Sequence, residues 1–271
     1  MSLKVRNIKS IVEDFAPTKL KVSYDNIGLM VGDLDKEVTN LLVALDCTLD
    51  VISEAVEKNC NLIYTHHPLL FIKPSSITEE TLTGKKVIQL IKNDISLYSA
   101  HTNLDSTEGG INDTIMKILG LHNYVTMEPS ENREAKDAKS GIGRFAKLEQ
   151  AISLKELCNK VKNSLGLSYL RYAGEEDMII SKVAVINGSG QDYFSLAKRM
   201  GADCIITGDT TYHFVSDYSE EGIGVIDPGH FGSEWPAFKA LAYILEKKLE
   251  GMGYNNKVII SEKAVEPYKL G

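Results

Sequence analysis

The chain has few cysteines and no long apolar run, and each shortage excludes a class of protein. Its four cysteines (Cys47, Cys60, Cys158 and Cys204) are widely spaced and form no Cys-x-x-Cys pair. This spacing argues against a disulfide framework and against a thiolate zinc site. We therefore expect buried free thiols and a reducing, cytoplasmic location. No apolar run approaches the roughly 18 residues that a membrane-spanning helix needs, and the N-terminus lacks the apolar core of a secretory signal.

Basic residues are also outnumbered, by 37 acidic residues to 30. The formal net charge of -7 and the sequence pI of about 5.5 argue against a general binder of nucleic acid backbones. The length of 271 residues and the apolar content of 43% are typical of a globular protein with a substantial core.

Short apolar runs alternate with helical patterns along the first half of the chain. Thr48 is placed to cap one of these helices at its N-terminus. A regular alternation of strand and helix is typical of a parallel α/β sheet. The pattern predicts strands over residues 41–46, 61–64 and 95–99, and helices over residues 8–15, 49–58, 84–92 and 111–119.

The second half repeats this pattern. Cys204-Ile205-Ile206-Thr207 matches Leu62-Ile63-Tyr64-Thr65, and strands are predicted on either side of it at Val183–Ile186 and Gly224–Asp227. A duplicated α/β unit explains the match economically. We therefore expect one unit over residues 1–125 and a second over residues 126–271. The charged stretch 131–139 is predicted to be an exposed loop at the seam, and the last helix, from about Ser233 to Glu250, to pack back on the first unit.

Two adjacent histidines, His66 and His67, close the predicted strand that ends at Tyr64. Neighbouring side chains on a regular strand point to opposite faces, but at the strand's end, where the backbone turns, both can face one cleft. Pro68 restricts the backbone of His67 and supports such a turn. Taken alone, the pair favours one structural histidine beside an exposed neighbour, and only the rest of the chain favours a metal site.

Further polar residues gather at the predicted strand ends. In parallel sheets ligands bind at the carboxyl ends of strands. A mixture of imidazole and carboxylate without thiolate suits zinc, iron, manganese, cobalt or nickel. The residues are His66, His67, His101 and Asp105 in the first half, and Asp209, His213, His230 and Glu234 in the second.

Three features leave alternatives open. His101 could act as a general base or could orient Asp105 from behind. Asp209 and His213 would share one face of a helix, where they could contact substrate or shuttle protons, or simply cap and fill. Gly188-Ser189-Gly190 follows a predicted strand, so its amides could hold a phosphate at a helix N-terminus, or the glycines could serve a tight turn.

Three motifs carry a resemblance to a known family. Tyr64-Thr65-His66-His67-Pro68, Ser99-Ala100-His101-Thr102-Asn103-Leu104-Asp105 and Pro228-Gly229-His230-Phe231-Gly232-Ser233-Glu234 occur in this order, after Tyr24-Asp25-Asn26-Ile27-Gly28. The set resembles the dinuclear-metal-centre proteins known as GTP cyclohydrolase 1 type 2 homologues, in the short form without an inserted domain.

The resemblance implies two similar, intertwined α/β units with largely parallel sheets and a metal site in the cleft between them. It also implies a homohexameric ring. Two divalent metal ions would be held in each chain, with Glu234 bridging them. The implied ligands are His66, His67, Asp105, His230 and Glu234.

These expectations favour a dinuclear-metal-dependent hydrolase that acts on a small molecule such as a nucleotide. Paired ions polarise a target and lower the pKa of bound water, which suits both a cyclohydrolase-like and a phosphoesterase-like reaction. The alternative is a non-catalytic protein that binds or delivers metal, or that assembles partners.

Overall fold

The computed structural model describes residues 2–130 and 139–269, which form two compact units. Unit 1 contains the chain up to Leu104 and again from Phe238, and unit 2 contains Asp105–Ala237. The division therefore falls at residue 104 and not at the predicted residue 125, because the segment after Leu104 packs with unit 2. The return of the chain at Phe238 makes the units intertwined in sequence. Residues 131–138 of the predicted seam loop lie outside the described part.

Unit 1 is built on a five-stranded sheet in the order β1-β4-β3-β2-β11. The strands β2, β3, β4 and β11 are parallel, and only the edge strand β1 is antiparallel to its neighbour. This confirms the predicted strand-helix alternation. The bounds are β1 Gly28–Val31, β2 Leu41–Ala44, β3 Leu62–Thr65, β4 Ser96–Ser99 and β11 Val258–Ile260.

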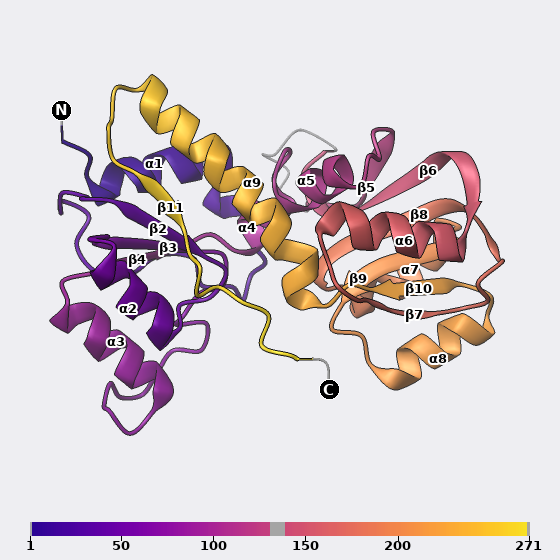
Figure 1. The fold of residues 1–271 in the computed structure, drawn as a ribbon, viewed down its shortest axis with the longest axis horizontal. Coiled ribbons are helices and arrows are strands. Elements are labelled where there is room, and N and C mark those ends of the chain that lie inside the picture. Colours follow the sequence, from indigo (N-terminus) through magenta and orange to yellow (C-terminus); the bar gives the residue numbers. More distant parts are fainter. Residues whose placement is uncertain (1, 131–138, 270–271) are drawn as a thin grey trace. The chain divides into compact units, whose positions relative to one another are not determined.

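Helices cover both faces of this sheet, as fully buried parallel strands require. Ile63 of β3 belongs to a cluster with side chains of α2 and α3, whereas its neighbour Tyr64 packs on Phe238 of α9, with ring centroids 5.1 Å apart. Figure 1 shows α2 and α3 on one side of these strands, and α1 and α9 on the other. The helices are α1 Val5–Phe15, α2 Leu49–Glu57, α3 Leu82–Lys92, α4 Thr102–Ser106 and α9 His230–Gly251, with a 3-10 turn at Thr18–Leu20.

Unit 2 contains a six-stranded mixed sheet in the order β5-β6-β8-β9-β10-β7. Its central strands β8, β9 and β10 are parallel, like β2, β3 and β4 of unit 1, which agrees with the repeat seen in the sequence. The outer strands β5, β6 and β7 are antiparallel additions. The bounds are β5 Tyr124–Pro129, β6 Gly141–Ser153, β7 Arg171–Ala173, β8 Ile179–Ser189, β9 Cys204–Gly208 and β10 Gly224–Asp227.

Helix α6 of unit 2 begins and ends where the sequence supplies caps. Ser153 forms the expected capping box with Glu156 at the start of α6, and Gly166 ends that helix in the left-handed conformation. The helices are α5 Ile111–Ile118, α6 Leu154–Leu165, α7 Phe194–Arg199 and α8 Tyr212–Glu220, with a 3-10 turn at Gln191–Tyr193.

The final helix begins earlier than predicted. α9 starts at His230, so Pro236 lies inside the helix and not in its first turn. Proline has no amide hydrogen, and the helical bond to the carbonyl four residues earlier is lost there.

The prediction of buried free thiols agrees with the described structure. All four cysteines are free and buried. Burial raises the pKa of the Cys47 thiol to about 12, so this thiol stays protonated and unreactive. No helix in the described ranges is long and apolar enough to cross a membrane.

A buried carboxylate fastens the C-terminal segment to unit 1. Glu54 of α2 is 2% exposed, pairs with Lys58 and accepts hydrogen bonds from the Ser261 hydroxyl and the Glu262 amide, directly after β11. Burial by itself would raise the pKa of Glu54, but the Lys58 ion pair and these hydrogen bonds lower it below the ordinary value.

We expect Glu54→Gln to lower the free energy of unfolding at pH 7 by about 1.5–3 kcal/mol, because charged hydrogen-bond partners are lost in a buried site. Urea titration measures this. Since the folded pKa is depressed, the contribution of Glu54 is lost as the pH falls through it, and the difference between the proteins should shrink below pH of about 4. Glu57→Gln on the exposed side of α2 is the control. Equal losses for both variants would contradict the assignment.

Candidate metal centre

Three histidines of unit 1 come together at the carboxyl ends of two parallel strands. His66 and His67 follow β3, and His101 follows β4, which pairs with β3 in parallel register. One ring nitrogen from each lies within 4.8 Å of the other two, a grouping that could hold a metal ion. The turn after β3 thus brings both neighbouring histidines to one place, as the His-His-Pro pattern predicted.

Each of these imidazoles is fixed through its Nδ1 atom. The Nδ1 of His66 lies 2.9 Å from the carbonyl oxygen of Ala100. A carbonyl oxygen only accepts hydrogen bonds, so Nδ1 carries the proton and Nε2 keeps its lone pair. His67 and His101 make the same kind of contact with carboxylates, Asp46 and Asp25, each at 2.9 Å. Such partners set the tautomer and ring orientation that a metal ligand needs.

Asp25, the partner of His101, is buried and held by several hydrogen bonds. Its side chain is fully buried, and it accepts hydrogen bonds from His101 Nδ1, the Thr102 amide and the Thr102 hydroxyl. Burial alone would raise the pKa of Asp25, but these hydrogen bonds outweigh it and lower the pKa to about 2. Asp25 therefore stays ionised at any physiological pH and holds a proton on the Nδ1 of His101.

A second polar cluster lies in unit 2 and contains both predicted carboxylate ligands. Asn187, near the end of β8, donates from Nδ2 to Asp105 Oδ1 at 2.8 Å and to Glu234 Oε1 at 3.1 Å. Glu234 Oε2 lies 3.1 Å from His230 Nε2. Asp105 and Glu234 are 7% and 3% exposed, so their charges need these partners. Three of the five predicted ligands thus form one connected cluster within this unit.

Asp209 supports His230 as Asp46 supports His67. Its Oδ2 lies 2.7 Å from His230 Nδ1. Asp209 has a positive φ of 50° and precedes α8, which begins only at Tyr212. Asp209 and His213 therefore do not share a helix face as expected. His213 is exposed, and its described contact is with the ring of Tyr212, so it does not join Asp209 at His230.

The glycine amides of the Gly188-Ser189-Gly190 segment form hydrogen bonds within the protein, which favours the tight turn over a phosphate site. The Gly188 amide donates to the Ser233 hydroxyl and the Gly190 amide to the Thr207 hydroxyl, both at 2.9 Å. A Cβ at Gly188 would lie 2.3 Å from Glu234 Oε1, and Gly188 also has a positive φ. The amides are therefore already bonded within the protein, and glycine is needed because Glu234 lies against the backbone. Of the two alternatives, the tight turn accounts for the motif.

The described contacts of His101 and Asp105 differ. His101 joins His66 and His67, and Asp105 accepts a side-chain hydrogen bond from Asn187. His101 thus has the surroundings of a ligand or a base at Nε2.

Sequence reasoning did not identify Asp25, Asp46 and Asn187. Asp46 and Asn187 lie at or just beyond the carboxyl end of a strand, the same signal that marked His67 and His101. Asp25 stands in the early Tyr-Asp-Asn motif, where only its contact with His101 distinguishes it from an ordinary turn residue.

The donor set fits a divalent metal ion. Imidazole Nε2 atoms with fixed tautomers and buried carboxylates are the ligand types that zinc, iron, manganese, cobalt and nickel accept. Each carboxylate or imidazole also has a supporting hydrogen bond, which a metal site needs to keep its ligands in place.

Comparison with known proteins agrees with the motif resemblance. The family model Duf34/NIF3 (NGG1p interacting factor 3) matches residues 3–267. A GTP cyclohydrolase 1 type 2 homolog from Clostridium acetobutylicum is 55% identical over 270 residues, with 100% of both chains covered. Staphylococcus aureus protein SA1388 has a TM-score of 0.90 at 28% identity, covering 100% of both chains. Reduced HcgD from Methanocaldococcus jannaschii has a TM-score of 0.83 at 31% identity, covering 97% of this chain and 99% of the other.

Asn187→Ala should lower metal affinity by about 10–100-fold, because Asp105 and Glu234 lose the amide that holds both. Titration of the chelated protein with Zn²⁺ measures this. Asn112→Ala is the control, since buried Asn112 forms its described hydrogen bonds with backbone groups, donating to the Asp105 carbonyl at 3.2 Å and accepting from the Asn187 amide at 3.3 Å. If both variants lose stability and affinity in parallel, Asn187 has only a general structural role.

Proposed function

Because the chain belongs to the Duf34/NIF3 (NGG1p interacting factor 3) family, we propose that it is a cytoplasmic metal-dependent hydrolase acting on a small molecule. Two divalent metal ions would be held by one centre that draws on both units. The proposal that one centre draws its ligands from both units rests on the order of the motifs in the sequence. The proposed ligands are His66, His67, Asp105, His230 and Glu234.

The observation that carries this proposal is the fixed orientation of the imidazoles. Five nitrogen–oxygen contacts of 2.7–3.1 Å involve His66, His67, His101 and His230, and four of them use Nδ1. A histidine that served packing alone would not need its second nitrogen held by a carboxylate. Repetition of this arrangement at successive strand ends supports a metal centre rather than scattered surface histidines.

Bound metal ions would lower the pKa of a water molecule and polarise the bond that it attacks. A side chain of the protein would accept the proton from this water. With its Nδ1 bonded to Asp25, His101 can accept a proton only at Nε2. The buried Asp25 carboxylate would stabilise the resulting imidazolium, as a base with a fixed tautomer requires. Asp209 would hold His230 in the same way but from a more exposed position.

Glu234 is the proposed bridge between the ions. It is 3% exposed and lies in α9, next to Asn187 and His230. A carboxylate can offer one oxygen to each of two ions and screen their repulsion, which a neutral amide cannot do.

Glu234→Gln should reduce metal content below two ions per chain while the fold is retained, because the volume of the side chain barely changes. Elemental analysis of protein purified without added metal measures the content. Glu220→Gln, on exposed α8, is the control. Two ions retained with unchanged affinity would mean that Glu234 does not bridge. Full metal content without turnover on nucleotides or phosphoesters would favour the non-catalytic alternative, a metal-binding or metal-delivery protein.

The family resemblance also leads us to propose a homohexamer. Apolar residues that an assembly could cover are exposed on α9, where Tyr243 and Ile244 are 57% and 60% exposed. Sedimentation equilibrium should therefore give six times the chain mass of 29.9 kDa. A stable monomer at micromolar concentration would contradict this.

A further inference from the structure

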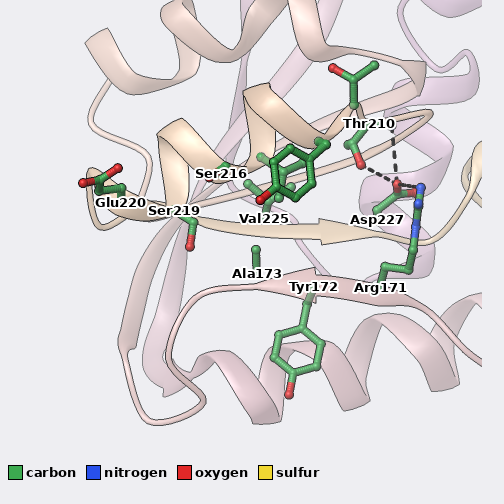
Figure 2. Close-up of a pocket in the computed structure, with 12 residues that line it drawn as sticks. Arg171, Tyr172, Ala173, Thr210, Ser216, Ser219, Glu220, Val225 and Asp227 are labelled. Atoms are coloured by element: carbon green, nitrogen blue, oxygen red, sulfur yellow. Dashed lines mark hydrogen bonds and ion pairs between the residues drawn. The ribbon is translucent and has the colours of Figure 1, made fainter.

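Unit 2 contains a cavity of about 650 Å³ that none of the proposed metal ligands lines. It lies between helix α8 and the strands β7 and β10, as Figure 2 shows. Its volume is in the range of small-molecule binding sites, about 300–1,000 Å³. None of the nine residues of α8 is buried, although Val215 and Tyr218 pack against the core of unit 2. The opposite side of α8 is anchored by the ring of Tyr218, 5.1 Å from that of Phe194.

One end of the cavity is cationic and rigid. Asp227 is 4% exposed and accepts hydrogen bonds from Arg171 Nη2 at 2.5 Å and the Thr210 hydroxyl at 2.6 Å. The Gly229 amide donates to its other oxygen at 2.8 Å. The Arg171 side chain nevertheless remains 69% exposed. Asp227 therefore holds Arg171 in position while other guanidinium N–H groups face solvent, where they can bind an anion such as a phosphate.

The rest of the cavity suits a ring with polar substituents. Tyr212 is 79% exposed, which is far more than packing requires of a tyrosine. Its neighbours along the same helix face are Ser216 and Ser219, and Ala173 and Val225 supply an apolar floor. Glu220 lies at the end opposite Arg171 in Figure 2, so an anionic group is repelled there and attracted to the Arg171 end.

The cationic end adjoins the supports of His230. Thr210 directly follows Asp209, which contacts His230 Nδ1, and Asp227 accepts from the amide of Gly229, the residue before His230. A phosphate near Arg171 would therefore lie beside the loops that carry the proposed metal ligand.

From these observations we propose that the cavity binds an organic phosphate ester that carries an aromatic ring, with its phosphate toward Arg171 and its ring toward Tyr212. The proposal rests on the hydrolase function for its biological meaning. Binding itself does not depend on bound metal, so the two can be tested separately.

The test is the binding of guanosine 5′-monophosphate and phenyl phosphate to the full chain by calorimetry, both as purified and after chelation of metal. Ser216→Trp should fill the cavity and lower both affinities at least tenfold. Ser53→Trp is the matched control, because Ser53 is an exposed helix serine of unit 1. Tyr212→Ala should weaken binding, whereas Tyr268→Ala should not, because Tyr268 is similarly exposed (77%) and does not line the cavity. Arg171→Gln should weaken the phosphate esters but leave guanosine unchanged.

Three results would overturn the proposal: no binding of either ester at about 1 mM, the upper range of ordinary enzyme affinities; unchanged binding by Ser216→Trp; or equal affinity for guanosine and its phosphate. Ester binding that follows these variants supports the site even in a protein that proves to bind no metal. If the protein binds metal but neither ester, the proposed metal centre is retained and the proposal for this cavity is wrong.

Discussion

The orientation of imidazole rings is the constraint on which the candidate centre depends. A histidine has two ring nitrogens, and it can present one of them reliably only if the other is held. In this protein a backbone carbonyl holds His66 and carboxylates hold His67, His101 and His230. Parallel strands make this possible, because their carboxyl ends bring several loops to one edge of a sheet while the strands behind remain rigid.

Burying a carboxylate costs free energy unless hydrogen bonds compensate for the lost water, and each buried carboxylate here accepts hydrogen bonds from different donors. Asp25 receives hydroxyl, amide and imidazole donors, and Asp227 receives a guanidinium, a hydroxyl and an amide. Asp105 and Glu234 share Asn187 instead, which is neutral. A cation such as arginine between those two carboxylates would neutralise the negative charge that could attract a metal ion. A neutral donor keeps the pair in place without removing its negative charge.

The sequence predicted the strand-helix order well because buried parallel strands leave nearly continuous apolar runs, such as Leu41–Ala44 and Cys204–Gly208. It also predicted the His66–His67 turn, since proline after a strand is a local signal. It could not predict the boundary at Leu104, because a helix pattern does not say which sheet it will pack against. The short edge strand β11 was similarly hidden, since only three of its residues pair with a neighbour.

The residues that form hydrogen bonds to the candidate site residues were harder to predict than those site residues themselves. Asp25 and His101 are 76 residues apart, and Asn187 and Asp105 are 82 apart, so nothing local links them. The Gly188-Ser189-Gly190 motif left two alternatives open from the sequence, because a local pattern does not show which groups pack against it in the fold. Gly188 lies against Glu234, and its amide donates to Ser233.

The same two loops of unit 2 serve both the candidate ligand and the cavity. In the loop after β9, Asp209 contacts His230, and the next residue, Thr210, contacts Asp227 at the cavity. The backbone at Asp209 is left-handed. After β10, Asp227 fixes Arg171 and also the Gly229 amide that precedes His230. A single buried carboxylate thus contacts both Arg171, which lines the cavity, and the backbone that leads into His230.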